Sequence, residues 1–193
     1  AILLSLSLVP IALTRATAPA LPNTATVGLG KLYRASPLGV AGVILSGALA
    51  GALYGLGPVF GAQSGFSIAG TATFMTVLIA GGVSLQWPLG LLSDVFDRRR
   101  VINAISIAMT IVSVLLVILP SDEGWLFSGL AFLFGGLLFS LYPLSMGHTN
   151  DHVSKEEMVG TSGALILVNS FGAIIGPLVA SWIMSVAGPT GLF

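Results

Sequence analysis

Five long apolar segments, none of which contains a charged side chain, most constrain what this chain can fold into. An α-helix needs about 20 apolar residues to cross a bilayer core of roughly 30 Å, and each run is close to or above that length. Only 7% of the residues are charged and the mean hydropathy is +1.01, whereas a soluble domain carries about 25% charged residues. The sequence therefore predicts an all-α, polytopic transmembrane helical bundle, with spans at 37–57, 71–92, 101–119, 125–147 and 159–186.

The residues before the first span divide into an apolar run and a polar stretch. Residues 1–13 are apolar, and Arg15 follows the run instead of preceding it as a signal peptide requires. We expect 1–13 to be the tail of a membrane helix whose beginning is missing, so that the chain is a fragment. Residues 14–36 are rich in Pro, Thr and Ala and are predicted to be a linker that packs no core. This leaves 37–193 as the helical bundle.

The basic residues predict how the bundle is oriented. Alternation of the spans places the linker 14–36, the turn 93–100 and the loop 148–158 on one side of the membrane. That side holds all seven Lys and Arg residues, and an opposite loop holds Asp122 and Glu123. Because cytoplasmic loops are enriched in Lys and Arg, we expect these three segments to be cytoplasmic.

The composition also excludes several classes of function. A net charge of zero argues against a nucleic-acid partner, which would need a basic face, and the absence of cysteine excludes disulfides and Cys-ligated metals. His148 and His152 lie four residues apart, a spacing that puts two imidazoles on one helix face. They have no second carboxylate motif nearby, so we interpret them as part of a solvated loop. No metal, cofactor or catalytic residue is predicted, and a His-dependent membrane enzyme is the weakest alternative.

The most densely charged segment is "GLLSDVFDRRRV", residues 90–101. It resembles the loop motif of the major facilitator superfamily (MFS), roughly G-x-L-x-D-R-x-G-R-R/K-x. The match runs through Gly90, Leu92, Asp94, Arg98 and Arg99, with Arg100 extending the basic run. This sequence departs from the family pattern at two positions, where Asp97 replaces the small Gly and Val95 replaces the first basic residue.

A second stretch, "NSFGAIIGPLVAS" at 169–181, resembles the G-x-x-x-G-P pattern of exporters in the same family, through Gly172, Gly176 and Pro177. The order of linker, two spans, charged turn and three spans is similar to the C-terminal half, from the tail of helix 6 to helix 11, with helix 12 missing. The resemblance implies a partner, the N-terminal half, that is absent here, and a bacterial cytoplasmic membrane. It also implies alternating-access transport of a small organic solute, with the second motif favouring proton-linked export by an antiporter.

The resemblance further implies that the charged turn is a conformational latch. Asp94 can accept hydrogen bonds from an arginine at the membrane edge, and Gly90 permits the close approach of a neighbouring helix. Asp97 is expected to change which arginine pairs with which carboxylate. The alternative is that the arginines at 98–100 only anchor the turn on the positive side and bind anionic lipid heads.

Polar side chains within the spans are few. No acidic or basic residue lies inside a predicted span, so this part of the protein lacks the usual intramembrane proton carrier. The candidates for contact with a substrate are Asn169, Gln86, Tyr54 and Tyr142. Asn169 is the strongest, because an amide is costly in hydrocarbon unless it meets a partner. A hydrogen bond between helices explains each of the four equally well, and a non-transporting receptor or assembly module with the same fold is the main alternative function.

Overall fold

The computed structural model describes residues 28–121 and 124–193. The predicted tail at 1–13, most of the predicted linker and the two acidic residues of the opposite loop therefore lie outside the described residues. Five described helices are long and apolar enough to cross a membrane. They are α3 (Pro37–Gln63), α4 (Ile68–Val95), α5 (Arg98–Ile118), α6 (Trp125–Asn150) and α7 (Met158–Ala187). A short 3₁₀ helix, η1 (Pro189–Leu192), follows them.

The predicted all-α class and the five predicted spans are confirmed, and the differences lie at the helix ends. The largest is in α3, which continues from residue 57 to Gln63 through Pro58. A proline inside a helix removes one backbone hydrogen bond, and the chain beyond it continues to pack, since Phe60 is fully buried. The first span is therefore longer than its sequence pattern indicates.

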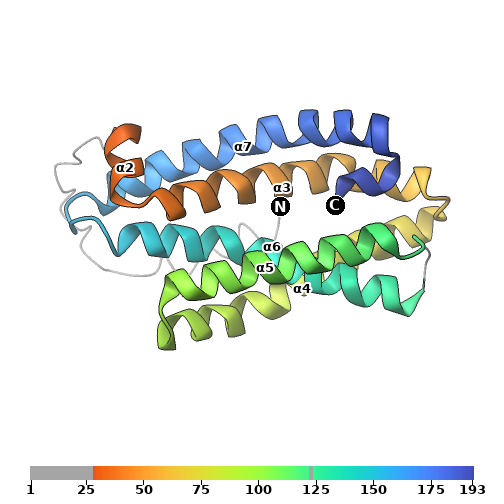
Figure 1. Cartoon of the computed structure of the whole chain (residues 1–193), viewed down its shortest axis with the longest axis horizontal. Coiled ribbons are helices and arrows are strands. Elements are labelled where there is room, and N and C mark those ends of the chain that lie inside the picture. The colour runs from red at the N-terminus through yellow and green to blue at the C-terminus, as the bar shows by residue number, and fades with distance from the viewer. Residues whose placement is uncertain (1–27, 122–123) are drawn as a thin grey trace, which may run out of the picture.

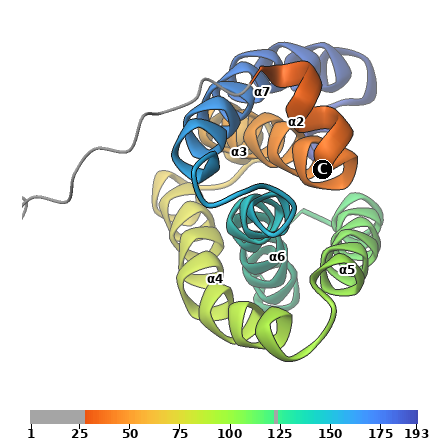
Figure 2. The same ribbon diagram turned by 90° about the vertical axis from the view of Figure 1, so that its left-hand side faces the viewer.

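The helices form two groups that meet at α6. Seen along the bundle, α3 and α7 lie side by side in one group, and in the other group α4 and α5 lie on either side of α6 (Figure 2). The main pairings are α3 with α7 and α4 with α6, and α6 also packs against α3 and α5. In the view of Figure 1 the helices run roughly parallel to the long axis, as expected for segments that cross a bilayer.

Close backbone contact at glycine holds both main pairs together. A Cβ atom at Gly135 of α6 would lie 2.0 Å from the Leu78 carbonyl oxygen of α4. A Cβ atom at Gly176 of α7 would lie 1.9 Å from the Ala48 carbonyl oxygen of α3. Lipid provides no hydrophobic drive between helices, so small residues that allow such contact supply the packing energy.

One end of the predicted linker differs from expectation. Residues Leu29–Ala35 form a short helix, α2, and Leu32 is fully buried against Val43 of α3 and Leu165 of α7. Residues 14–36 are predicted to be too polar to pack a core, but Leu32 on this short helix packs into the bundle. The chain therefore enters the bundle through a packed helix.

Candidate functional site at the charged end of the bundle

The basic residues described by the structure gather at one end of the bundle. That end holds α2, the turn between α4 and α5, and the loop between α6 and α7 (Figure 1). Two ion pairs join these segments, Arg98 with Asp151 and Lys31 with Glu157. The predicted placement of the three segments on one side thus holds for their described residues, which are Lys31, Arg34, Arg98, Arg99, Arg100 and Lys155.

Arg98 joins the ends of three helices. It is the first residue of α5, and its Nη1 donates to Oδ2 of Asp151, the C-cap residue of α6, over 2.8 Å. Its Nη2 donates to Oδ1 of Asp94, near the end of α4, over 3.3 Å. The fork of a guanidinium is suited to binding two carboxylates at once. Because both carboxylates are more than half exposed, each pair contributes about 0.2–1 kcal/mol.

Asp97 has a different task from its neighbours in the motif. It is the N-cap of α5, and its Oδ1 accepts hydrogen bonds from the backbone N–H of Arg99 at 2.9 Å and of Arg100 at 3.3 Å. An acidic N-cap satisfies N–H groups that have no partner inside the helix. The departure from the family pattern at this position thus starts α5, while Asp94 and Asp151 share Arg98.

Two glycines shape the surroundings of Arg98. A Cβ atom at Gly147 would lie 2.7 Å from Nη1 of Arg98, so this position gives the guanidinium room to reach Asp151. A Cβ atom at Gly90 would have nothing within 4 Å among the described residues. Gly90 instead faces a cavity of about 420 Å³ between α4 and α6, which Asp94 and Arg98 also line. The expected helix contact at Gly90 is thus not made by the described part of this chain.

Asp151 and Gly147 also belong to this cluster, although nothing in the sequence around them indicates it. Asp151 lies between the two histidines in the sequence, 53 residues from its partner Arg98. The one usable signal was the predicted placement of the 93–100 turn and the 148–158 loop on the same side.

The structure does not bring the four substrate candidates together. Asn169 Nδ2 donates to the Val43 carbonyl oxygen over 3.1 Å, and Ser46 Oγ lies 3.4 Å away, so the strongest candidate joins α7 to α3. Gln86 lines the cavity beside the charged turn. Tyr54 is half exposed, and its ring lies 5.7 Å from that of Phe139 on α6.

Tyr142 packs beside Leu32 and Leu165 at the charged end, far along α6. The second predicted motif, on α7, packs against α3. Cβ atoms at Gly172 and Gly176 would meet the carbonyl oxygens of Ile44 and Ala48 at 2.2 and 1.9 Å. In this structure the motif is therefore a helix-packing surface.

The second ion pair attaches α2 to the start of α7. Lys31 Nζ donates to Oε1 of Glu157, the N-cap residue of α7. This hydrogen bond from Lys31 is the main reason why the pKa of Glu157 lies below its ordinary value of 4.5. The Lys31 side chain is mostly exposed and that of Glu157 is partly buried, so the pair lies at the surface where α2 meets the loop.

Five apolar spans, four of which meet through glycine, with ion pairs gathered at one end, define an integral, multi-pass α-helical membrane protein. Residues 1–177 match the model of the Major Facilitator Superfamily, and the chain belongs to this family.

Its relatives include proteins named uncharacterized MFS-type transporter YcaD. The one from Escherichia fergusonii is 31% identical over 182 residues, which cover 92% of this chain and 46% of the relative. The one from Salmonella paratyphi B is 34% identical over 154 residues, which cover 78% of this chain and 38% of the relative. The chain thus spans less than half the length of these relatives. No solved structure matches it.

Proposed function

We propose that this chain is the C-terminal half of a secondary active transporter, which moves a small organic solute across a bacterial cytoplasmic membrane by alternating access. The relatives are named as transporters, and that favours transport over enzymatic catalysis or a purely structural role. The charged end would face the cytoplasm, as its basic residues favour. The resemblance of the α7 motif to exporters favours proton-coupled efflux, with the proton carrier supplied by the other half.

The observation that carries the proposal is the pair of bonds from Arg98 to Asp94 and Asp151. These bonds fix the ends of α4, α5 and α6 relative to one another, beside a cavity in which Gly90 offers an open backbone surface. A helix of the other half would dock there while the cytoplasmic side is closed. Two exposed pairs of about 0.2–1 kcal/mol each suit a latch, because a contact that is too strong would trap one state.

The proposal can be tested without knowing the substrate. The chain has no cysteine, so single cysteines can be introduced into the full-length protein after any native cysteines outside this chain are replaced. Leu91→Cys reports on the cavity beside the turn, and Ala69→Cys reports on the opposite end of α4. Each reporter is combined with Asp94→Asn, and its reaction with a membrane-impermeant maleimide is timed in inside-out and right-side-out vesicles.

Alternating access predicts opposite changes at the two reporters. Asp94→Asn should open the charged end, so that the cysteine at 91 reacts faster and the cysteine at 69 reacts more slowly. Unchanged rates at both positions would contradict the latch. Faster reaction at both positions would indicate a loosened bundle and would contradict alternation.

A further inference from the structure

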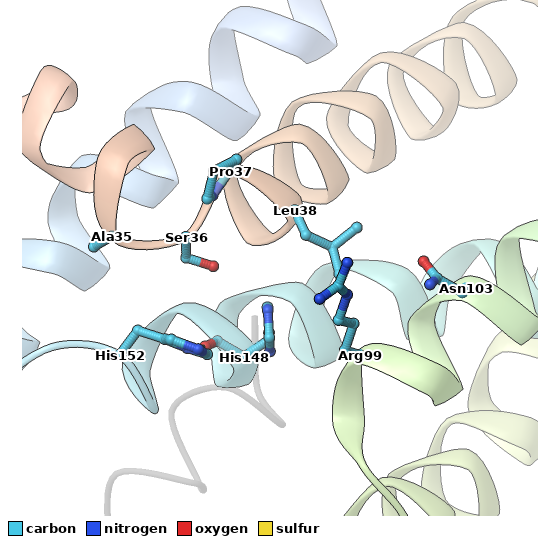
Figure 3. A pocket seen from close by; sticks show the side chains of 8 residues that line it. All are labelled: Ala35, Ser36, Pro37, Leu38, Arg99, Asn103, His148 and His152. Atoms are coloured by element: carbon cyan, nitrogen blue, oxygen red, sulfur yellow. The ribbon is translucent and has the colours of Figure 1, made fainter.

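A second cavity at the charged end has the lining of an anion site. It has a volume of about 380 Å³ and lies between the start of α3, the first turns of α5 and the end of α6 (Figure 3). Its polar lining residues are Ser36, Arg99, Asn103, His148 and His152. The Arg99 side chain extends from α5 toward α3, and both imidazole rings lie on the α6 side of the same space (Figure 3).

The charges around this cavity are unbalanced. None of the described residues that line it is acidic. Asp94 and Asp151 are both bound to Arg98, and the Asp97 oxygen is bound to backbone N–H groups. Within the described residues, Arg99 therefore has no carboxylate partner, and its guanidinium places an unpaired positive charge on the wall of the cavity.

The two histidines add donors whose number depends on protonation. His152 Nδ1 lies 2.7 Å from the His148 carbonyl oxygen, and the two rings are 4.6 Å apart. A carbonyl oxygen only accepts, so Nδ1 of His152 carries the hydrogen and the neutral ring leaves a lone pair on Nε2. Protonation converts that Nε2 into a donor and adds a positive charge. The ring then attracts an anion that its neutral form would repel.

This combination favours an anion over a metal ion. A divalent cation would be repelled by the guanidinium of Arg99, whereas a phosphate oxygen can accept from its fork in bidentate fashion. The Asn103 amide and the Ser36 hydroxyl can donate to further oxygens. A volume of about 380 Å³ falls in the range of roughly 300–1,000 Å³ that small-molecule sites occupy.

We propose that this cavity binds a phosphate group, carried by the headgroup of an anionic lipid or by a soluble phosphate compound. The proposal does not depend on the latch, because Arg99 takes no part in the bonds between Arg98 and its carboxylates. It also differs from a general attraction of the basic turn to lipid, since Arg100 does not line the cavity.

Binding is expected to strengthen at lower pH. The charged groups that face the two rings are Arg99 and Arg98 of α5, Asp97 before it, and Asp151 from the same segment as the histidines. The lining residues of α2 and α3 bring no charge. Burial lowers the pKa of His148 from its ordinary value of 6.5, so the positive charge that this ring adds to the cavity appears as the pH falls below that value.

The test measures the thermal unfolding midpoint of the full-length protein in detergent micelles free of anionic lipid, at constant ionic strength. A ligand that binds only the folded state raises this midpoint. Inorganic phosphate, phosphatidylglycerol and phosphatidylcholine are added separately, at pH 6 and pH 8. The variants are Arg99→Gln and His152→Gln. Arg100→Gln is the matched control, since it removes the same charge one residue away and outside the cavity.

The unfolding midpoint is expected to rise when phosphatidylglycerol, inorganic phosphate or both are added. Phosphatidylcholine should cause no comparable rise. A response to the lipid alone identifies a headgroup site, and a response to phosphate identifies a soluble ligand. The rise with phosphatidylglycerol should be larger at pH 6 than at pH 8, should at least halve in Arg99→Gln, and should be smaller in His152→Gln. The proposal is overturned by no response to either probe, or by an equal loss in Arg100→Gln. An unchanged response in both cavity variants would also overturn it.

Discussion

Arg98 and Asp151 are 53 residues apart in the sequence, yet Nη1 of the arginine lies 2.8 Å from Oδ2 of the aspartate. The same guanidinium lies 3.3 Å from Oδ1 of Asp94, four residues earlier at the end of α4. The shorter bond is thus the one that crosses from α5 to α6. Both bonds join different helices, but the Asp151 bond connects segments far apart in the sequence, whereas the Asp94 bond spans only the short turn between α4 and α5.

The first prediction concerns this cross-helix bond. Asp151→Asn should lower the free energy of unfolding by no more than about 1 kcal/mol, since the pair is partly exposed. A loss of about 1 kcal/mol changes the ratio of two states about fivefold. If it acts on the closed and open states of the charged end, labelling of Leu91→Cys should accelerate by up to that factor. Arg98→Lys, which keeps the charge but loses the fork, should show an intermediate rate. A large drop in the unfolding midpoint without faster labelling would assign Asp151 to folding alone.

The second prediction distinguishes the N-cap role of Asp97 from the latch that Arg98 forms with Asp94 and Asp151. Asp97→Ala should destabilise the protein by about 1 kcal/mol, because the N–H groups of Arg99 and Arg100 lose their acceptor. Asp97→Asn should retain most of the stability, since an amide oxygen also accepts. Chemical denaturation in mixed micelles measures both. If Asp97→Asn were as damaging as Asp97→Ala, the negative charge and not the cap would be what matters.

The sequence predicted the membrane class, the five spans and the end that carries the basic residues, because each depends on local composition. The partners of those residues could not be predicted. Nothing in the pattern around Asp151 indicates that it pairs with Arg98, since that bond depends on how α5 and α6 pack. Asp97 was singled out as a departure from the family pattern, but its capping role depends on where α5 begins.

For Asn169, the sequence predicted the need for a hydrogen-bond partner but not which residue provides it. Its cost in hydrocarbon correctly indicated that it needs a partner, but the identity of that partner is a tertiary property. The close approach of α3 and α7 places the Val43 carbonyl oxygen within reach of its amide. Leu32 was missed because a single buried residue in a short segment leaves no periodic pattern.

The third prediction concerns the α4–α6 contact. Gly135→Ala would place a methyl group 2.0 Å from the Leu78 carbonyl oxygen, so the two backbones must separate, at a cost of about 1–3 kcal/mol. Gly129→Ala is the control on the same helix, where the added carbon meets nothing within 4 Å and helix propensity favours alanine by about 1 kcal/mol. The two unfolding midpoints should therefore move in opposite directions. Similar decreases in both would contradict close packing as the role of Gly135.

The fourth prediction addresses Asn169. Asn169→Ala should remove the hydrogen bond to α3 and lower the free energy of unfolding by about 0.6 kcal/mol, the average for such bonds in membranes. Ser170→Ala is the control, because its hydroxyl bonds only within α7. Once a substrate is known, its apparent affinity should be the same in both variants. A selective loss of affinity in Asn169→Ala would restore this residue to the substrate site.

The last prediction is a pH dependence at the junction of α2 with α7. The bond from Lys31 lowers the pKa of Glu157 below 4.5, so the folded state favours the ionised carboxylate. The pair therefore contributes its full stability above the unfolded pKa and loses it as the pH falls through the folded pKa. The difference in unfolding midpoint between the unmodified protein and Glu157→Gln should be present at neutral pH and vanish in that acidic range. Glu156→Gln, a neighbouring exposed glutamate, should show no such difference, and a difference that persisted in acid would contradict the ion pair.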